Sequence, residues 1–270
     1  MKKLPQNKVL IYDDNCPLCK AYTKAFVKGG FLREENRISF SNVNMQQFKI
    51  DWQKAKHEIP LVNIDTGEVK YGVDALVDIL QQKIPFIPIL LKIKWLNWFL
   101  RKLYKLISYN RKIIVAKTKT SVSNFDCTPD YNFFYRRLLT IICFFASSFF
   151  LYATTKSLLL TFSSTTYLIA IAFLFLMIGL ITWYKSKKMA TEILAHSSIV
   201  LLIISFLLFV ASIFQKIFLF PPSIFYFFLS IIFLVMVLQI KQRIQFIATM
   251  DLSAKPLSIN VSGHTLNRQD

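Results

Sequence analysis

Two of the four cysteines in this 270-residue chain stand three positions apart, within the stretch YDDNCPLCK. Cys16 and Cys19 follow a short apolar run and open a segment whose apolar residues recur at helical spacing. Residues i and i+3 at the start of a helix share a face, so the two sulfurs come close together. Free backbone N–H groups and the helix dipole favour a negative sulfur at Cys16, and Pro17 suits the first helical position. The spacing predicts thiol–disulfide exchange in which Cys16 attacks and Cys19 resolves the mixed disulfide.

Two carboxylates, Asp13 and Asp14, immediately precede this pair. A nearby like charge disfavours the thiolate and raises the pKa of the thiol, and Lys20 and Lys24 offset part of that effect. Because a less stabilised thiolate leaves a more stable disulfide, we predict a reducing couple. We also predict a catalytic role for Asp13 as a proton relay to Cys19. The alternative is that Asp13 only caps the turn before the helix.

The cysteine pair has two competing interpretations. A closed zinc site needs four ligands, and the chain has no second Cys-x-x-Cys, so His57 and Cys127 are the further ligands to consider in the N-terminal region. A two-coordinate copper(I) site on the two thiolates is the second metal alternative, because soft thiolates select that ion. An inert structural pair is the other interpretation. The prediction made here is no metal site and no cofactor.

The first 83 residues alternate between strand-like and helix-like segments. The predicted order is strand, helix, strand, helix, strand, strand, helix, over residues 9–13, 17–28, 37–43, 45–58, 61–65, 69–71 and 73–82. This is the order of the α/β thioredoxin fold, with the Cys-x-x-Cys at the first strand-to-helix junction. Pro60 stands directly before the third strand, where thioredoxin-like proteins carry a cis-proline beside the active cysteines. We therefore predict that Pro60 and Pro17 contact the substrate and treat Pro60 as a candidate cis-proline.

The stretch Tyr12-Asp-Asp-Asn-Cys-Pro-Leu-Cys19 resembles the signature of the DCC family of thiol-disulfide oxidoreductases, which is named for an Asp-x-x-Cys-x-x-Cys motif. Asp13, Cys16 and Cys19 match that motif. Further similar blocks are Gly72-Val-Asp-Ala75, the Tyr…Asn-Arg block ending at Arg111, and Cys127-Thr-Pro-Asp-Tyr-Asn132. The resemblance covers about residues 7–137 and implies a redox activity on protein thiols or disulfides. Asp14 departs from the family, which usually has glycine there.

The C-terminal half has the composition of a membrane protein. The chain is 54% hydrophobic with 26 Phe, and four runs of 18 or more residues carry no formal charge: 138–155, 157–184, 193–215 and 217–240. Each run is long enough to cross a hydrocarbon core of roughly 30 Å, so we predict four transmembrane helices. Seven Lys and Arg residues flank the spans on one side and two on the other. The positive-inside rule then places both termini, and the N-terminal domain, in the cytoplasm.

The segment between these halves is strongly basic. Residues 84–137 carry eleven basic and two acidic side chains, mixed with Trp, Leu and Ile, and much of the formal net charge of +18 resides there. Because this segment stands beside a predicted membrane span, we predict that it binds lipid rather than nucleic acid. The alternative is that its apolar side completes the core of the N-terminal domain. We therefore predict a redox domain over residues 1–83 and a basic helical extension over 84–137. A four-helix membrane domain follows over 138–243, and a polar tail over 244–270.

Two functions remain at this stage. The first is a membrane-tethered cytoplasmic thiol-disulfide oxidoreductase acting on a protein partner. The second is a non-enzymatic membrane protein whose cysteine head binds a partner or a soft metal. No phosphate-binding loop, metallohydrolase motif or nucleophile elbow occurs in the sequence.

Overall fold

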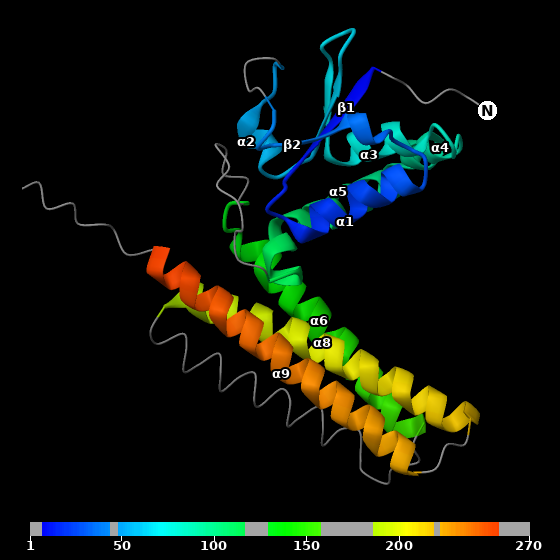
Figure 1. The fold of residues 1–270 in the computed structure, drawn as a ribbon, viewed down its shortest axis with the longest axis vertical. Helices are drawn as coiled ribbons and strands as arrows, with labels where there is room; N and C mark the ends of the chain where they lie inside the picture. The colour runs from blue at the N-terminus through cyan, green and yellow to red at the C-terminus, as the bar shows by residue number, and fades with distance from the viewer. Residues whose placement is uncertain (1–6, 44–47, 117–128, 158–185, 219–221, 254–270) are drawn as a thin grey trace, which may run out of the picture.

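A computed structural model describes residues 7–43, 48–116, 129–157, 186–218 and 222–253. It has two parts, a mixed α/β head and a bundle of long helices that extends from it (Figure 1). The helix α5 lies across the head and is followed in the described chain by the first helix of the bundle (Figure 1). This confirms the predicted fold class, an α/β N-terminal part followed by an all-α apolar part.

The head is built on a four-stranded sheet of order β2-β1-β3-β4. The strands are β1 (Lys8–Tyr12), β2 (Arg37–Ser39), β3 (Pro60–Asn63) and β4 (Val69–Tyr71). β1 pairs in parallel with β2, whereas β3 is antiparallel to both of its neighbours. The β3–β4 hairpin turns through Gly67, whose φ of 70° favours glycine. The order of strands along the chain agrees with the predicted α/β arrangement, and the strands form one mixed sheet.

Alternation along β1 supplies both faces of the sheet. Val9 and Ile11 join one buried cluster with Phe40, Ala55 and Val62. Leu10 points the other way into a second cluster, with Leu32, Ile59, Leu61, Ala75 and Ile79. β1 lies between β2 and β3 and is buried on both faces, which explains the continuous apolar run Val9–Ile11.

The head helices are α1 (Pro17–Lys28), the short 3₁₀ turn η1 (Glu34–Asn36), α2 (Trp52–Ala55) and α3 (Gly72–Leu80). The bounds of α1 are the predicted ones, with Gly29 as the C-terminal cap. Residues 45–47 of the predicted helix 45–58 lie outside the described residues. Among the residues from 48 on, the prediction is too long, because Asp51 is the N-cap, its carboxylate accepts from the Lys54 N–H, and the helix extends only over Trp52–Ala55. β2 is likewise shorter than predicted.

The basic segment forms α4 (Ile87–Lys92) and α5 (Lys94–Ile114). One side of α5 is buried, with Leu106 and Ile113 packed in a cluster shared with the bundle. The other side leaves large apolar side chains exposed: Trp95, Trp98, Phe99, Leu103 and Ile107. One side of α5 therefore packs as the alternative of a core-completing helix requires. Its other side keeps the uncovered apolar face that the alternative of a lipid-binding segment requires.

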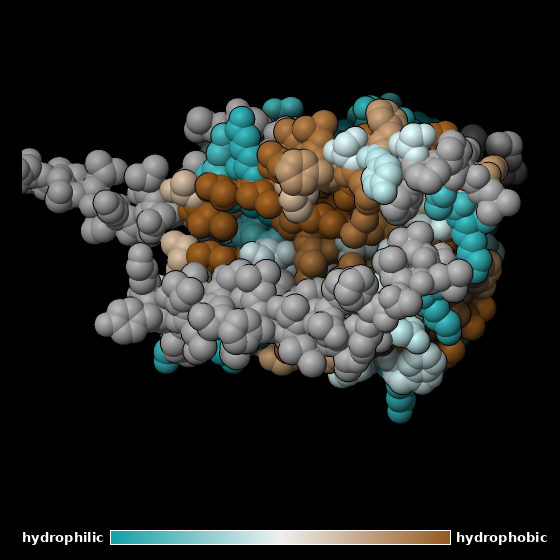
Figure 2. Space-filling model, turned by 90° about the horizontal axis from the view of Figure 1, so that it is seen from below, coloured by the Kyte–Doolittle hydropathy of each residue, from teal (hydrophilic) through white to brown (hydrophobic). Residues whose placement is uncertain are grey.

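The bundle consists of α6 (Phe133–Ser157), α8 (Lys187–Phe218) and α9 (Pro222–Ser253). Three described stretches, Phe133–Lys156, Lys187–Phe218 and Tyr226–Ala248, are long and apolar enough to cross a membrane. The prediction of four is corrected to three for the described residues, because the run 157–184 lies almost wholly outside them. Seen from below, apolar residues form a broad exposed surface (Figure 2), and the exposed bundle side chains include Phe145, Phe149, Phe227 and Phe233.

Buried polar side chains join the head to this bundle. Arg136 on α6 donates to the Asn110 amide oxygen of α5 at 2.9 Å and lies 3.1 Å from the Glu192 carboxylate of α8. Arg243 of α9 donates to the carbonyl of Ile113 at 2.7 Å. All four of these charged or amide side chains are buried. The helices of the bundle therefore extend beyond the uncharged runs and use their charged ends to hold α5.

Candidate functional site

The turn between β1 and α1 fixes the position of Cys16. The Asp13 carbonyl accepts from the Cys16 N–H at 3.2 Å, and the Asp13 carboxylate accepts from the Asn15 N–H at 2.9 Å. Cys16 is the N-cap of α1, with Pro17 in the first helical turn. Its sulfur accepts from the backbone N–H of Cys19 at 3.3 Å, which occupies one of the orphan donors of the helix start. The predicted geometry of the pair is confirmed in this respect.

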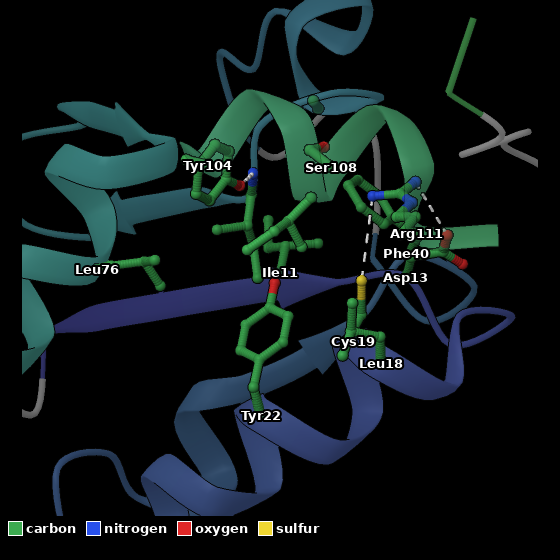
Figure 3. Close-up of a pocket in the computed structure, with 13 residues that line it drawn as sticks. Ile11, Asp13, Leu18, Cys19, Tyr22, Phe40, Leu76, Tyr104, Ser108 and Arg111 are labelled. Atoms are coloured by element: carbon green, nitrogen blue, oxygen red, sulfur yellow. Dashed lines mark hydrogen bonds and ion pairs between the residues drawn. The ribbon is translucent and has the colours of Figure 1, made fainter. Parts of the chain in front are cut away.

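Arg111 of α5 reaches this turn from the opposite side of the head (Figure 3). One guanidinium nitrogen lies 3.1 Å from the Asp13 carboxylate, and another donates to the Cys19 sulfur at 4.0 Å. Arg111 is 8% exposed and Asp13 5%. The buried Arg111–Asp13 pair contacts the Cys19 sulfur, the inner of the two thiols, and so holds a positive charge beside the cysteine pair.

The two thiols have different acidities. Hydrogen bonding from the Cys19 thiol, the Arg111 charge and the Cys19 N–H lower the pKa of Cys16 to about 7, against burial and the charge of Asp13. The Cys16 sulfur and burial raise the pKa of Cys19 well above its usual value. At neutral pH about half of Cys16 is therefore a thiolate while Cys19 stays protonated, the arrangement that an attacking and a resolving cysteine require.

The charges around the pair differ from the sequence-based expectation. Neighbouring carboxylates were expected to raise the pKa of the nucleophile, with Lys20 and Lys24 compensating; the net direction is opposite, because the Cys19 thiol and Arg111 outweigh Asp13. Asp14 accepts from the Ser41 hydroxyl at 2.7 Å, beyond the end of β2. Burial raises the pKa of Asp13 even against Arg111, so this carboxyl is closer to accepting a proton than an exposed one.

Sequence reasoning missed Arg111 as a site residue. It lies 92 positions from Cys19, and its only sequence signal was its place in the Tyr…Asn-Arg block. Tyr104 of the same block lies about two helical turns before Arg111 on α5. Its hydroxyl accepts from the Ile59 N–H at 2.9 Å. Two residues of the block therefore contact the head from one face of α5.

Pro60 and Pro17, the predicted substrate-contacting residues, occupy different surroundings. Pro17 begins α1 beside the pair, whereas Pro60 is a fully buried residue at the start of β3. The Ile59–Pro60 bond is trans, so the candidate cis-proline is not supported. Their contact with a substrate stays a prediction.

The residues considered as metal ligands are dispersed. The His57 imidazole pairs with Asp130 at 2.9 Å and stacks on the Tyr109 ring, away from the cysteine turn. Cys127 lies outside the described residues. Within the described part of the chain, no three His, Cys, Asp or Glu side chains form a group that could hold a metal ion.

A cavity of about 300 Å³ opens beside the inner cysteine. It lies between β1, α1 and α5, and Figure 3 shows its lining side chains, among them Cys19, Tyr22, Tyr104 and Arg111. Apart from these four, Asp13 and Ser108, the lining is apolar: Ile11, Leu18, Phe40, Ala55, Ile59, Leu76 and Ile107. Neither Pro17 nor Pro60 lines it.

Residues 10–117 match the family model of the DCC1-like thiol-disulfide oxidoreductases. Over these residues the head is similar to the DCC1-like family. The matched range runs from β1 to the residues just after α5, so it contains the cysteine turn, the sheet and Arg111. The resemblance read from the Asp-x-x-Cys-x-x-Cys motif is thereby confirmed. No curated protein and no solved structure is significantly similar to the chain.

The DCC1-like assignment supports a redox function at the level of the family. The apolar helices of the bundle are compatible with membrane tethering of this domain. The match ends before α6, so it carries nothing about the bundle itself.

Proposed function

We propose that this protein is a membrane-tethered thiol-disulfide oxidoreductase in which Cys16 attacks and Cys19 resolves. The observation that carries the proposal is the position of Cys16 at the N-terminus of α1, where it accepts from the Cys19 N–H and has a pKa of about 7. A thiolate is the reactive form, and a pKa near neutrality makes about half of it available at pH 7. No cofactor enters this chemistry.

The reaction consists of two exchanges. The Cys16 thiolate attacks one sulfur of a partner disulfide, forms a mixed disulfide and releases the other partner sulfur as a thiolate, which takes a proton. Cys19 then loses its proton, attacks the Cys16 sulfur and releases the second partner thiol. In sum, the Cys16–Cys19 dithiol becomes a disulfide and the partner disulfide becomes a dithiol.

Asp13 is proposed as the acceptor of the Cys19 proton. Its carboxyl is buried, with a raised pKa, and shares the Arg111 guanidinium with the Cys19 sulfur. Arg111 is proposed to stabilise the negative charge that forms on Cys19 during the second exchange. Arg111 is thus an addition to the predicted site residues.

The head is proposed to face the cytoplasm. Arg136, Arg137, Lys187 and Lys188 lie at the head-proximal ends of α6 and α8, with Lys241 near the corresponding end of α9, while Lys156 and Lys216 lie at the far ends. This asymmetry favours a cytoplasmic head by the positive-inside rule. Thioredoxin, whose nucleophile also has a pKa of about 7, is a reductant near −270 mV, so we propose a reducing couple here as well.

The test is a redox titration of the full chain in detergent, read by thiol mass-tagging. The expected result is one two-electron transition that disappears in Cys16→Ser and in Cys19→Ser but persists in Cys143→Ser, whose cysteine is buried in α6. Absence of a Cys16–Cys19 disulfide at any potential would overturn the proposal. Purification with bound metal would instead favour the alternative, a binding head without enzymatic activity.

A further inference from the structure

Both cysteines of the pair are almost closed off from solvent. Cys16 and Cys19 are each 4% exposed. The cavity described above contains Cys19 but not Cys16 in its lining. The two sulfurs therefore have different surroundings: the Cys16 sulfur lies at the helix start, and the Cys19 sulfur lines the partly open cavity. A partner protein cannot enter a cavity of about 300 Å³, but a small molecule can.

The chemistry of the cavity is selective. Its lining is apolar over most of its surface, with polar groups gathered near Cys19 and between α1 and α5. The Tyr22 hydroxyl projects from α1 toward α5, and the Arg111 guanidinium lies above the Cys19 sulfur (Figure 3). Burial raises the pKa of Tyr22 well above its usual value, so its hydroxyl stays protonated and able to donate. An uncharged ring that carries hydrogen-bond acceptors fits this lining.

An apolar ridge on α5 leads to the same cavity. Trp95, Phe99, Leu103 and Ile107 are spaced four residues apart, which places them along one side of the helix. All four are exposed, by 69, 49, 38 and 41% respectively. Ile107 alone among them also lines the cavity. Since the helices of the bundle are apolar enough to cross a bilayer, a lipid-dissolved ligand meets this ridge close to the membrane.

We propose that the cavity binds a lipid-soluble quinone, which the Cys16–Cys19 dithiol reduces to the hydroquinone. This rests on the proposed redox pair and names its electron acceptor. The two thiols lose two protons and two electrons and form one S–S bond. The quinone gains both electrons and both protons, so its two carbonyls become hydroxyls. A dithiol reductant then restores the pair by thiol–disulfide exchange at Cys16.

Three features favour a quinone over a charged disulfide of low molecular weight. A carboxylate-bearing ligand would lose its hydration in an apolar cavity whose one guanidinium already pairs with Asp13. A quinone is uncharged, accepts the two electrons that a dithiol gives up, and presents carbonyl oxygens to the Tyr22 and Arg111 donors. It also dissolves in a bilayer of the kind that the bundle helices are apolar enough to cross.

The experiment is a single-turnover oxidation of the full chain in lipid nanodiscs, with decylubiquinone as the probe. The protein is reduced, freed of reductant and mixed with quinone without oxygen. Loss of quinone absorbance and formation of the Cys16–Cys19 disulfide are followed together. Ile107→Trp, at the junction of ridge and cavity, is expected to slow the reaction about tenfold or more at low quinone concentration. Ile64→Trp is the matched control, because this exposed apolar side chain just after β3 lies outside both the ridge and the lining, and it is expected to leave the rate unchanged.

A second variant, Tyr22→Phe, removes the proposed hydroxyl donor and is expected to slow the quinone reaction several-fold. Oxidation of the pair by a soluble disulfide is measured for every variant, and is expected to be unaffected in Ile107→Trp. Wild-type protein that forms a reversible disulfide but is not oxidised by decylubiquinone would overturn the inference and leave the proposed function standing. Equal rates in Ile107→Trp and Ile64→Trp would also overturn it. A pair that forms no disulfide with any oxidant would overturn both.

Discussion

The buried cation beside the cysteine pair is the most informative single residue to change. Arg111→Met keeps the length and apolar stem of the side chain and removes its charge. In the wild-type protein the guanidinium lies 3.1 Å from the Asp13 carboxylate and donates to the Cys19 sulfur at 4.0 Å. Its removal takes away one of the contributions that lower the pKa of Cys16 to about 7. It also leaves Asp13, 5% exposed, without its charged partner.

Two magnitudes follow from this geometry. The charge of Arg111 is one of the causes that lower the pKa of Cys16, so we expect that pKa to rise by about one in Arg111→Met. The thiolate fraction at pH 7 then falls from about one half to about one tenth, which slows alkylation about fivefold. Breaking a buried ion pair by removing one partner costs about 3–5 kcal/mol, so the melting temperature of the head falls as well.

The assay is the rate of iodoacetamide alkylation at Cys16 between pH 5 and 10, read by peptide mass spectrometry. Lys112→Met, which removes the neighbouring cation on α5, is the matched control and is expected to keep the wild-type midpoint. The double variant Asp13→Asn/Arg111→Met removes the stranded carboxylate and is expected to recover most of the lost stability. An alkylation midpoint in Arg111→Met equal to that of the wild type would refute the assignment of Arg111 to the thiolate.

Three further changes test the head and its junction with the bundle. Lys8 and Lys70 lie 2.8 and 3.2 Å from Asp78; burial alone would raise the pKa of that carboxyl, but these lysines hold it below its usual value. The stabilisation by Asp78 is therefore present above the unfolded pKa and is lost as pH falls through the folded one. Asp78→Asn should make the fall in melting temperature below about pH 4 smaller than in the wild type. Gly72→Ala should lower the free energy of unfolding by about 1–2 kcal/mol, because φ is +57° and a Cβ would meet Tyr104 and Glu58 at 3.2 and 3.1 Å. Thermal unfolding measures the loss, and Gly67→Ala is the control, since its φ is also positive but nothing lies within 4 Å of the added Cβ. Arg136→Met should cost about 3–5 kcal/mol by isolating buried Glu192, whereas exposed Arg137→Met should be near neutral in the same assay.

Local chemistry made part of this site predictable. The Cys16, Pro17 and Cys19 spacing fixes an N-cap and a first turn without reference to the rest of the fold, and α1 has the predicted bounds. The helix over 45–58 was predicted too long, because a polar stretch gives weak periodicity and the capping carboxylate of Asp51 decides its start. Arg111 was missed because burial against a site 92 residues away leaves no local signal in a helix already rich in cations. The sign of the Cys16 pKa shift depended on that same distant charge.

The placement of Arg111 also bears on why a thiol domain is joined to several long apolar helices. Adjacent residues of α5 serve the two parts: Arg111 contacts Asp13 and Cys19, while the Asn110 amide accepts from Arg136 and donates to the Tyr135 carbonyl of α6. Arg136 in turn lies against Glu192 of α8, and Arg243 of α9 donates to the Ile113 carbonyl of α5. A hinge between head and bundle would break buried polar contacts on the three apolar helices α6, α8 and α9, and each group would be costly to leave unpaired. The last turns of α5 therefore fix the cysteine site at a set position relative to the bundle, which a single tethering helix would not do.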